Sequence, residues 1–304
     1  MRIVYIHQHF NFPWEPGWQR PWQFARRLVR AGHEVTVICG GSKAEDLSLE
    51  GVTIRRLAVP YENAMAFQQR VRSFISFMAR ATLSAAQADA DVVFASSTPL
   101  TTAVPGIIAS KLRRAPFVFE VRDLWPEAPV ALGFVKNPIT ILAARTLEKL
   151  AYRSADHVIA LSPGMEEGVR RVWPRARTTV VPNASDVENF SEGRARRAEV
   201  REELGWDDDD VVLFYAGSFG ITYDVPWLVR LAGSCISATL ASASSPTVRV
   251  LIQSARETSP EATASTPTRC SQERFRARRS NECCPPLTSP CRRWWTTLPW
   301  RSTR

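Results

Sequence analysis

Residues 117–127 read Phe-Val-Phe-Glu-Val-Arg-Asp-Leu-Trp-Pro-Glu, an apolar run that ends in charged residues. Several such runs along the first two thirds of the chain are continuous rather than alternating, which is typical of strands covered by helices on both faces. The expected strands are Ile3–His7, Val35–Cys39, Thr53–Leu57, Asp91–Ala95, Phe117–Val121, His157–Leu161 and Thr179–Val181.

Segments of helical length lie between these strands. The expected helices are Trp18–Ala31, Ala64–Ala88, Thr101–Arg113, Asn137–Arg153 and Pro163–Val172. Gly32 suits the end of the first helix, and Pro163 suits the first turn of a helix that follows Ser162. Strands that alternate with helices predict an α/β fold, a Rossmann-like, doubly wound parallel sheet.

A second domain of the same kind is expected to start after a linker. Val211–Ala216 resembles a strand, and it ends in Gly-Ser-Phe-Gly at 217–220. The pattern then stops, and 28 of the 69 residues from Ile236 onward are Ser, Thr or Pro. We therefore expect a first domain at 1–185, a linker and truncated second domain at 186–235, and a disordered segment at 236–304.

The last segment also differs in its charge. It carries 11 Arg against 4 Glu, or +7 of the net charge of +9. A nucleic-acid partner is disfavoured, because this charge forms no stripe on an expected helix. The cysteines of the segment have no histidine beside them and no zinc-ligand spacing, so we expect no metal site.

A change of reading frame is one hypothesis for this segment; an ordinary low-complexity segment is the other. If GC-rich synonymous codons from Ser234 onward are read from each third base, they can spell LHLGDPRVRVVADG. The stretch from Glu282 can spell RMLPAADVALPSLVDD in the same way. Both strings have the strand and turn character that a second domain needs.

The loop from Gln8 to Gly17 lies between the first strand and the helix that carries Arg20. A glycine at such a turn lets a substrate approach the backbone, and the helix N-terminus favours an anion. Gly17 and Arg20 are therefore candidate substrate-binding residues, with a plain surface loop as the alternative. A dinucleotide cofactor is disfavoured because the loop lacks G-x-G-x-x-G.

The strongest candidate site follows the strand at 117–121. Ligands of doubly wound sheets bind at the carboxyl ends of the strands. The candidates here are Glu120, Arg122, Asp123, Trp125 and Glu127. A structural ion pair of Arg122 with Asp123 or Glu120 is the alternative.

The segment Glu-Val-Arg-Asp-Leu-Trp-Pro at 120–126 resembles a motif of bacterial family 4 glycosyltransferases of the GT-B fold, a group that builds surface polysaccharides and includes aminosugar transferases. The order and spacing of further motifs agree over residues 1–231. These motifs are Ala31–Val37, Ser96–Pro99, Tyr152–Asp156, Leu161–Met165 and Val181–Asp186.

The resemblance implies transfer from a sugar nucleotide to a lipid-linked saccharide, with retained configuration and without a metal ion or other cofactor. It implies that Arg122 and Asp123 orient the acceptor or the reacting sugar. It also implies that Gly217, Ser218 and Gly220 face the donor diphosphate. The donor-domain Glu-x7-Glu region of the family has no counterpart in this sequence. An inactive remnant, or a binding module that keeps only the acceptor domain, is therefore the alternative function.

The expected location is the cytoplasm, because the N-terminus has no apolar stretch of signal-peptide length. The segment Phe67–Gln87 combines phenylalanines with Arg70, Arg72 and Arg80. Such a helix could rest on an anionic membrane surface at the inner face of the membrane. The alternative is that its phenylalanines belong to the core.

Overall fold

The computed structural model of the chain describes residues 1–13, 15, 20–62, 65–97, 99–133, 135–185, 187–217, 224–231 and 248–254. The described part divides into two compact units, residues 1–195 and residues 196–254. Each unit is an α/β structure in its own right.

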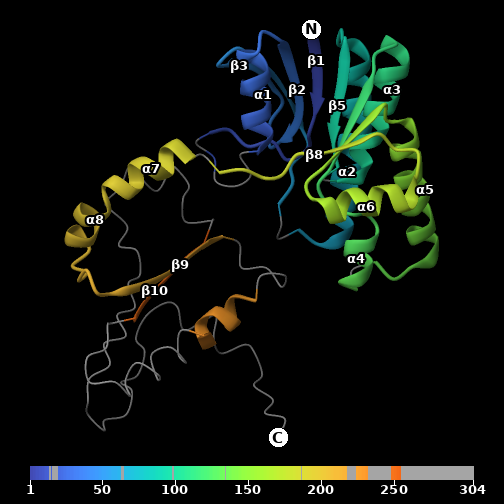
Figure 1. The fold of residues 1–304 in the computed structure, drawn as a ribbon. Helices are drawn as coiled ribbons and strands as arrows, with labels where there is room; N and C mark the ends of the chain where they lie inside the picture. The colour runs from blue at the N-terminus through green and yellow to red at the C-terminus, as the bar shows by residue number, and fades with distance from the viewer. Residues whose placement is uncertain are drawn as a thin grey trace, which may run out of the picture. The chain divides into compact units, whose positions relative to one another are not determined.

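An eight-stranded sheet forms the centre of the first unit (Figure 1). Its strands are β1 (Arg2–Ile6), β2 (Glu34–Gly41), β3 (Glu45–Leu49), β4 (Val52–Ala58), β5 (Val92–Ser96), β6 (Phe117–Val121), β7 (His157–Ala160) and β8 (Thr178–Val180). Their order is β3-β4-β2-β1-β5-β6-β7-β8, and all pairs are parallel except β3 with β4. The predicted doubly wound parallel sheet is therefore confirmed.

Helices lie between these strands, and one more follows the last strand; the starts of two of them follow local sequence signals. They are α1 (Arg20–Arg30), α2 (Phe67–Gln87), α3 (Ala103–Arg113) after the 3-10 turn η1 (Leu100–Thr102), α4 (Glu127–Ala131), α5 (Pro138–Ser154), α6 (Pro163–Val172) and α7 (Val187–Ala195). Asn137 caps α5, since its side-chain oxygen accepts hydrogen bonds from the backbone N–H groups of Ile139 and Thr140 at 2.9 and 3.2 Å. Ser162 caps α6 in the same way. Each cap precedes a proline in the first turn, as the sequence predicts for Pro163.

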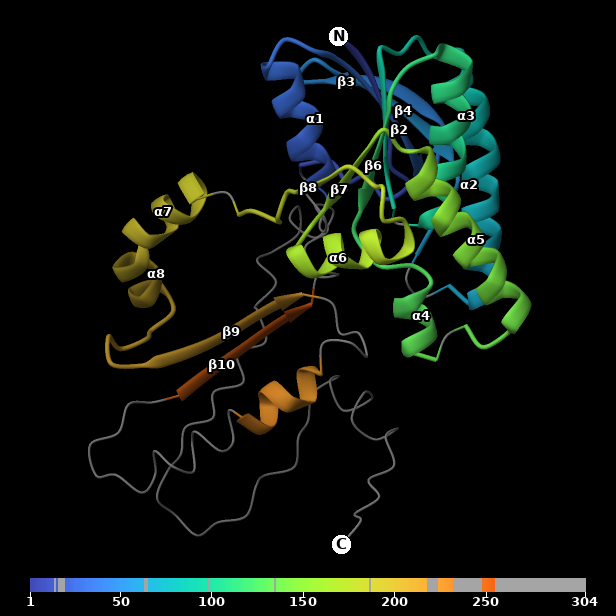
Figure 2. The same ribbon diagram turned by 45° about the vertical axis from the view of Figure 1, so that its right-hand side comes forward.

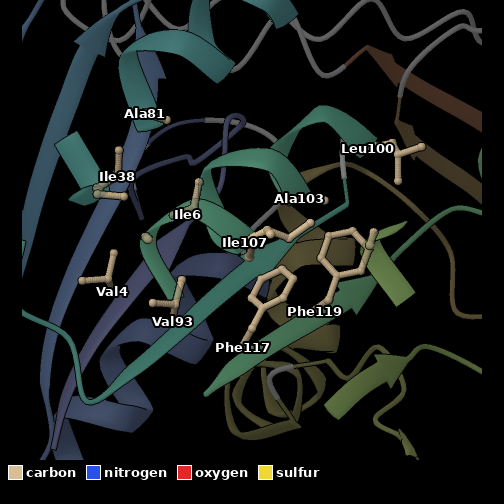
Figure 3. Packing of buried hydrophobic residues seen from close by; sticks show 14 of the residues in the cluster. Val4, Ile6, Ile38, Ala81, Val93, Leu100, Ala103, Ile107, Phe117 and Phe119 are labelled. Carbon is tan, nitrogen blue, oxygen red and sulfur yellow. The ribbon is translucent and has the colours of Figure 1, made fainter. Parts of the chain in front are cut away.

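Two apolar cores lie on the two faces of the sheet, because successive strand residues alternate between faces. On β1, Val4 and Ile6 join the larger core, while Ile3 and Tyr5 join the smaller one. The larger core packs under α2, α3, α5 and α6, with Phe117 among its largest side chains (Figure 3). The smaller core packs under α1. The alternative in which the phenylalanines of α2 are core is confirmed for Phe77, which is fully buried in the larger core.

Strand β3 was not predicted, because Glu45–Leu49 is polar and lies at the edge of the sheet. It joins the sheet through a tight hairpin turn. Glu50 and Gly51 both have positive φ angles, 46° and 80°. Two positive φ angles are the signature of the turn that links antiparallel strands most tightly.

The second unit contains α8 (Arg197–Glu203), a parallel pair of strands, β9 (Val211–Gly217) and β10 (Val248–Ser254), and helical residues 225–231. The predicted strand at 211–216 is thus present. Of the segment 236–304, which we expected to be disordered, only 248–254 are described, and they form β10; the rest of that prediction lies outside the described residues. The sequence of β10, Val-Arg-Val-Leu-Ile-Gln-Ser, is rich in β-branched residues that suit a strand, and β9 supplies the partner.

Candidate functional site

The candidate site lies at the carboxyl ends of the parallel strands of the first unit. From β1 the chain passes through α1 to β2 on one side, and it later returns to β5 on the other side of β1. The strand order therefore reverses between β1 and β5. Ligands of doubly wound sheets bind outside this switch point. Figure 1 labels β1, β2 and β5, and Figure 2 labels β6, β7 and β8 of the same sheet.

The structure brings Arg20 and Glu120 together in a buried ion pair. Arg20 Nε donates to Glu120 Oε1 at 2.8 Å, and only 12% and 1% of the two side chains are exposed. Ser96 Oγ, at the end of β5, donates to the other carboxylate oxygen at 2.6 Å. Both oxygens of Glu120 are thus engaged by neighbouring elements of the same domain.

Arg20 also reaches the end of β8. Its two terminal nitrogens donate to the backbone carbonyl oxygens of Val181 and Pro182, each at 2.8 Å. One guanidinium therefore connects α1, β6 and the chain that leaves β8. The role of Arg20 and Glu120 as substrate-binding residues stays a prediction beside this structural one.

Arg122 follows β6 directly and is held from two neighbouring strands. Its backbone N–H donates to Ser97 Oγ, just after β5, at 2.8 Å. Its Nη1 lies 3.2 Å from Nε2 of His7, just after β1. Since Val118 packs with the smaller core, strand alternation places Glu120 and Arg122 on the same face as α1.

His7 is fully buried, and this burial together with the charge of Arg122 holds the pKa of its imidazole well below the usual value. Because a guanidinium can only donate, Nε2 must accept and the proton of the neutral ring sits on Nδ1. Burial and the same Arg122 charge lower the pKa of His9 to about 4. Both imidazoles are therefore neutral at pH 7. Neither can act as a general acid there without a change in its surroundings.

The other candidates of the motif lie around this arginine. Asp123 and Glu127 are exposed, and Glu127 is the first residue of α4. Trp125 is partly buried against the larger core and precedes Pro126 in a cis peptide bond. Leu124 packs against Gly168 of α6, where an added Cβ would come within 2.7 Å of it. This contact fixes the loop that carries Asp123.

The remaining candidates are not part of this cluster. Gly217 is the last residue of β9, in the second unit. Gly17, Ser218 and Gly220 lie outside the described residues.

Sequence reasoning missed His7, and it quoted Ser96 and Ser97 only as part of a motif. A signal was available, because each of them ends or follows one of the two strands at the switch point. Parallel strands bring their carboxyl ends to one edge, so polar residues there are expected to meet Arg122.

Several solved structures are similar in fold to this chain. Sucrose-phosphate synthase from Thermosynechococcus elongatus is 18% identical, with a TM-score of 0.56, and the match covers 83% of this chain and 61% of that one. The α,α-trehalose 6-phosphate synthase from Burkholderia multivorans is 10% identical, with a TM-score of 0.56 and coverages of 83% and 62%. The E. coli trehalose-6-phosphate protein bound with UDP-2-fluoro glucose is 12% identical, with a TM-score of 0.59 and coverages of 87% and 67%. The architecture is thus that of GT-B glycosyltransferases.

The sequence comparison gives the family. Residues 17–184 match the glycosyl transferase 4-like domain, and the chain belongs to that family. No curated protein matches the chain. The chain spans about three fifths of the length of the synthases named above. Among the described residues, no helix is both long and apolar enough to cross a membrane.

Proposed function

We propose that the chain forms the acceptor side of a glycosyltransferase that moves a sugar from a sugar nucleotide to a saccharide acceptor. The observation that carries this proposal is the position of Arg122 at the switch point, held by Ser97 and His7. The family match over residues 17–184 supports the same reaction class. The UDP-2-fluoro glucose bound to the E. coli relative suggests a nucleoside diphosphate sugar as the donor.

The chemistry asks for positive charge near the breaking bond. When the bond from the sugar to the diphosphate breaks, negative charge develops on the departing oxygen, and a fixed cation stabilises it. A guanidinium suits this task because it stays protonated and presents several donors in one plane. His7 adds no second positive charge beside Arg122, because burial favours its neutral imidazole. In this proposal Arg122 supplies this positive charge. Arg122 and Asp123 also orient the acceptor or the reacting sugar.

The finer part of the proposal rests on the resemblance of the motif at 120–126. It assigns a lipid-linked saccharide acceptor, retained configuration, no metal ion, and surface-polysaccharide synthesis at the cytoplasmic face of the membrane. Because the group that the motif resembles includes aminosugar transferases, the proposed sugar is an N-acetylated aminosugar.

The proposal also includes a shift of reading frame near Ser234. The chain as it stands would then lack most of the donor-binding domain, and its described second unit offers one strand pair beside α8 and residues 225–231. Without a positioned donor, effective-molarity gains of about 7–11 kcal/mol are lost, so transfer by this chain should be undetectable. A domain that binds acceptor without turnover is the second candidate function.

Two measurements test these proposals. Native mass spectrometry of this chain and of a frame-restored chain, each with a panel of sugar nucleotides, should show a complex only for the restored chain. In the restored chain, Arg122→Ala should lower turnover by more than about tenfold, or about 1.4 kcal/mol of transition-state stabilisation. Arg30→Ala, an exposed arginine on α1, is the matched control and should leave turnover unchanged. A folded Arg122→Ala variant with full turnover would show that the site is misplaced. Turnover by the unrestored chain at a rate near that of the restored one would refute the frame-shift part.

A further inference from the structure

Exposed apolar side chains gather on one side of the first unit. Among the described residues of 1–185, nine large apolar side chains are exposed. Seven of them lie on α2, α3 and α5, while Met1 is at the N-terminus and Leu132 ends α4. The seven on these helices are Ile75, Leu83, Ile108, Leu112, Ile139, Leu142 and Leu150. The three helices cover the same face of the sheet and lie side by side, with α3 between the other two (Figures 1 and 2). We call their outward side the outer helix face.

The exposed residues form stripes along these helices. On α5, Ile139 and Leu142 are 76% and 67% exposed, and Lys149 and Arg153 continue the same line. Residues spaced by three, four and seven share one side of a helix. These helices therefore have two apolar sides, of which one is packed on the sheet and the other is open.

A similar stripe runs along α2, where Arg72, Ile75, Ala79 and Leu83 are all exposed. It is not the phenylalanine face that the sequence suggested for membrane contact, since Phe77 is buried in the core.

The charge on the outer helix face is mostly positive, although Arg113 of α3 pairs with Asp89, just after α2, at 3.3 Å. Helices α2, α3 and α5 together carry eight basic residues and one acidic residue, Glu148. Glu148 is buried beneath the surface and accepts a hydrogen bond from Tyr152. By contrast, α6 lies in the same layer but exposes Glu167, Arg170 and Arg171 in balanced pairs, and no large apolar residue of it is exposed.

This combination selects the partner. Two copies that met through this face would bring mostly like charges together, because the neighbouring Asp89 already pairs with Arg113 and Arg2 of its own chain, and this opposes a dimer. Nucleic acid would satisfy the charge, but the exposed apolar residues are aliphatic and cannot stack on bases as aromatic side chains do. An anionic bilayer satisfies both features, because Leu and Ile enter the headgroup boundary while Lys and Arg reach lipid phosphates.

We propose that the outer helix face docks the protein on a membrane that is rich in anionic lipid. This inference rests on the proposed function only in that a lipid-linked acceptor gives the protein a reason to be there. The surface itself follows from the exposure and charge of α2, α3 and α5.

The test uses the purified 304-residue chain without sugar nucleotide. Co-sedimentation measures its partition onto vesicles of phosphatidylcholine alone and of phosphatidylcholine with about one third phosphatidylglycerol. We expect binding to the anionic vesicles that weakens steeply with salt, and little binding to the neutral ones.

Two double variants remove the two features separately. Ile139→Ser with Leu142→Ser removes apolar contact, and Lys111→Glu with Lys149→Glu reverses charge. Each should lower partition by about tenfold or more. The matched controls are Val187→Ser with Val211→Ser, which are exposed elsewhere, and Arg27→Glu with Arg30→Glu on α1, across the sheet. All eight positions are exposed, so each variant should fold, and circular dichroism checks this.

The outcomes separate the alternatives. Partition that is absent, that is equal on both vesicles, or that falls as much in the controls overturns the proposal. So does a solution dimer that the apolar variant dissociates, or binding to duplex DNA in place of vesicles. Failure of vesicle binding together with sugar transfer by the restored chain would sink this inference alone. Vesicle binding without any transfer would leave it standing and sink the proposed function.

Discussion

Removal of the Glu120 carboxylate should destabilise the first unit strongly. The carboxylate accepts from Arg20 Nε at 2.8 Å and from Ser96 Oγ at 2.6 Å, and it is 1% exposed. In Glu120→Ala, Arg20 keeps its two carbonyl acceptors but loses its anionic partner. The variant thus leaves the largely buried guanidinium of Arg20 without a negative charge beside it.

The magnitude follows from what is removed. Breaking a buried ion pair by deleting one partner costs about 3–5 kcal/mol. The Ser96 hydroxyl also loses its acceptor. A hydrogen bond to a charged group contributes about 1.5–3 kcal/mol, so this loss does not move the total out of that range. Glu120→Gln keeps the shape and one acceptor oxygen, so we expect a smaller loss of about 2 kcal/mol.

Urea unfolding followed by tryptophan fluorescence measures these differences, since Trp22 of α1 is buried in the smaller core. The matched control is Glu167→Ala, which breaks an exposed pair with Arg171 at 3.8 Å in the same unit. It should cost less than about 1 kcal/mol. If Glu120→Ala costs no more than this control, the pair does not hold the fold. Binding of substrate would then be the better account of Glu120.

Two further predictions concern other residues. Burial raises the pKa of Glu148 from 4.5 to about 7, so the stability linked to its neutral form is complete below pH 4.5 and is lost as pH rises through about 7. The free energy of unfolding of Glu148→Gln, compared with that of the parent, should therefore be higher at pH 8 than at pH 4 by up to about 3 kcal/mol. Urea unfolding at the two pH values measures this, and an equal difference at both would contradict it. Asn137→Ala removes the cap of α5 and should cost about 1 kcal/mol, and Asn183→Ala, an exposed position without a cap role, is its control. Equal unfolding midpoints for the two alanine variants would count against the capping role.

The fold of the first unit could be predicted because its strands and helices carry strong local signals. The run at 117–121 and the capped start at Ser162 each determine an element without help from the rest of the chain. Strands β3 and β10 could not be predicted, because the stability of each comes from a partner strand elsewhere in the sequence. The apolar pattern and the strand propensity of a segment predict a strand only when the faces of that strand are buried.

The candidate site was predicted in position but not in its pairings. The sequence suggested Arg122 as the possible partner of Glu120, two residues away, whereas Glu120 pairs with Arg20, one hundred residues away. That pairing depends on where α1 crosses the sheet, which local patterns do not contain. His7 was missed for the same reason, since its contact with Arg122 joins β1 to β6 across β5.

The spacing of Glu120 and Arg122 lets one strand face serve structure and chemistry together. Val121, between them, points into the larger core and holds the end of β6 in place. Glu120 then anchors Arg20, and Arg20 in turn holds the carbonyl groups of Val181 and Pro182. Arg122 lies just beyond the carboxyl end of β6. A substitution at Glu120 should therefore disturb Arg122 through the backbone even if Glu120 never touches a substrate. In the frame-restored chain, a loss of turnover in Glu120→Gln that exceeds its loss of folded protein would be the sign of that coupling, and turnover per folded molecule equal to the parent would exclude it.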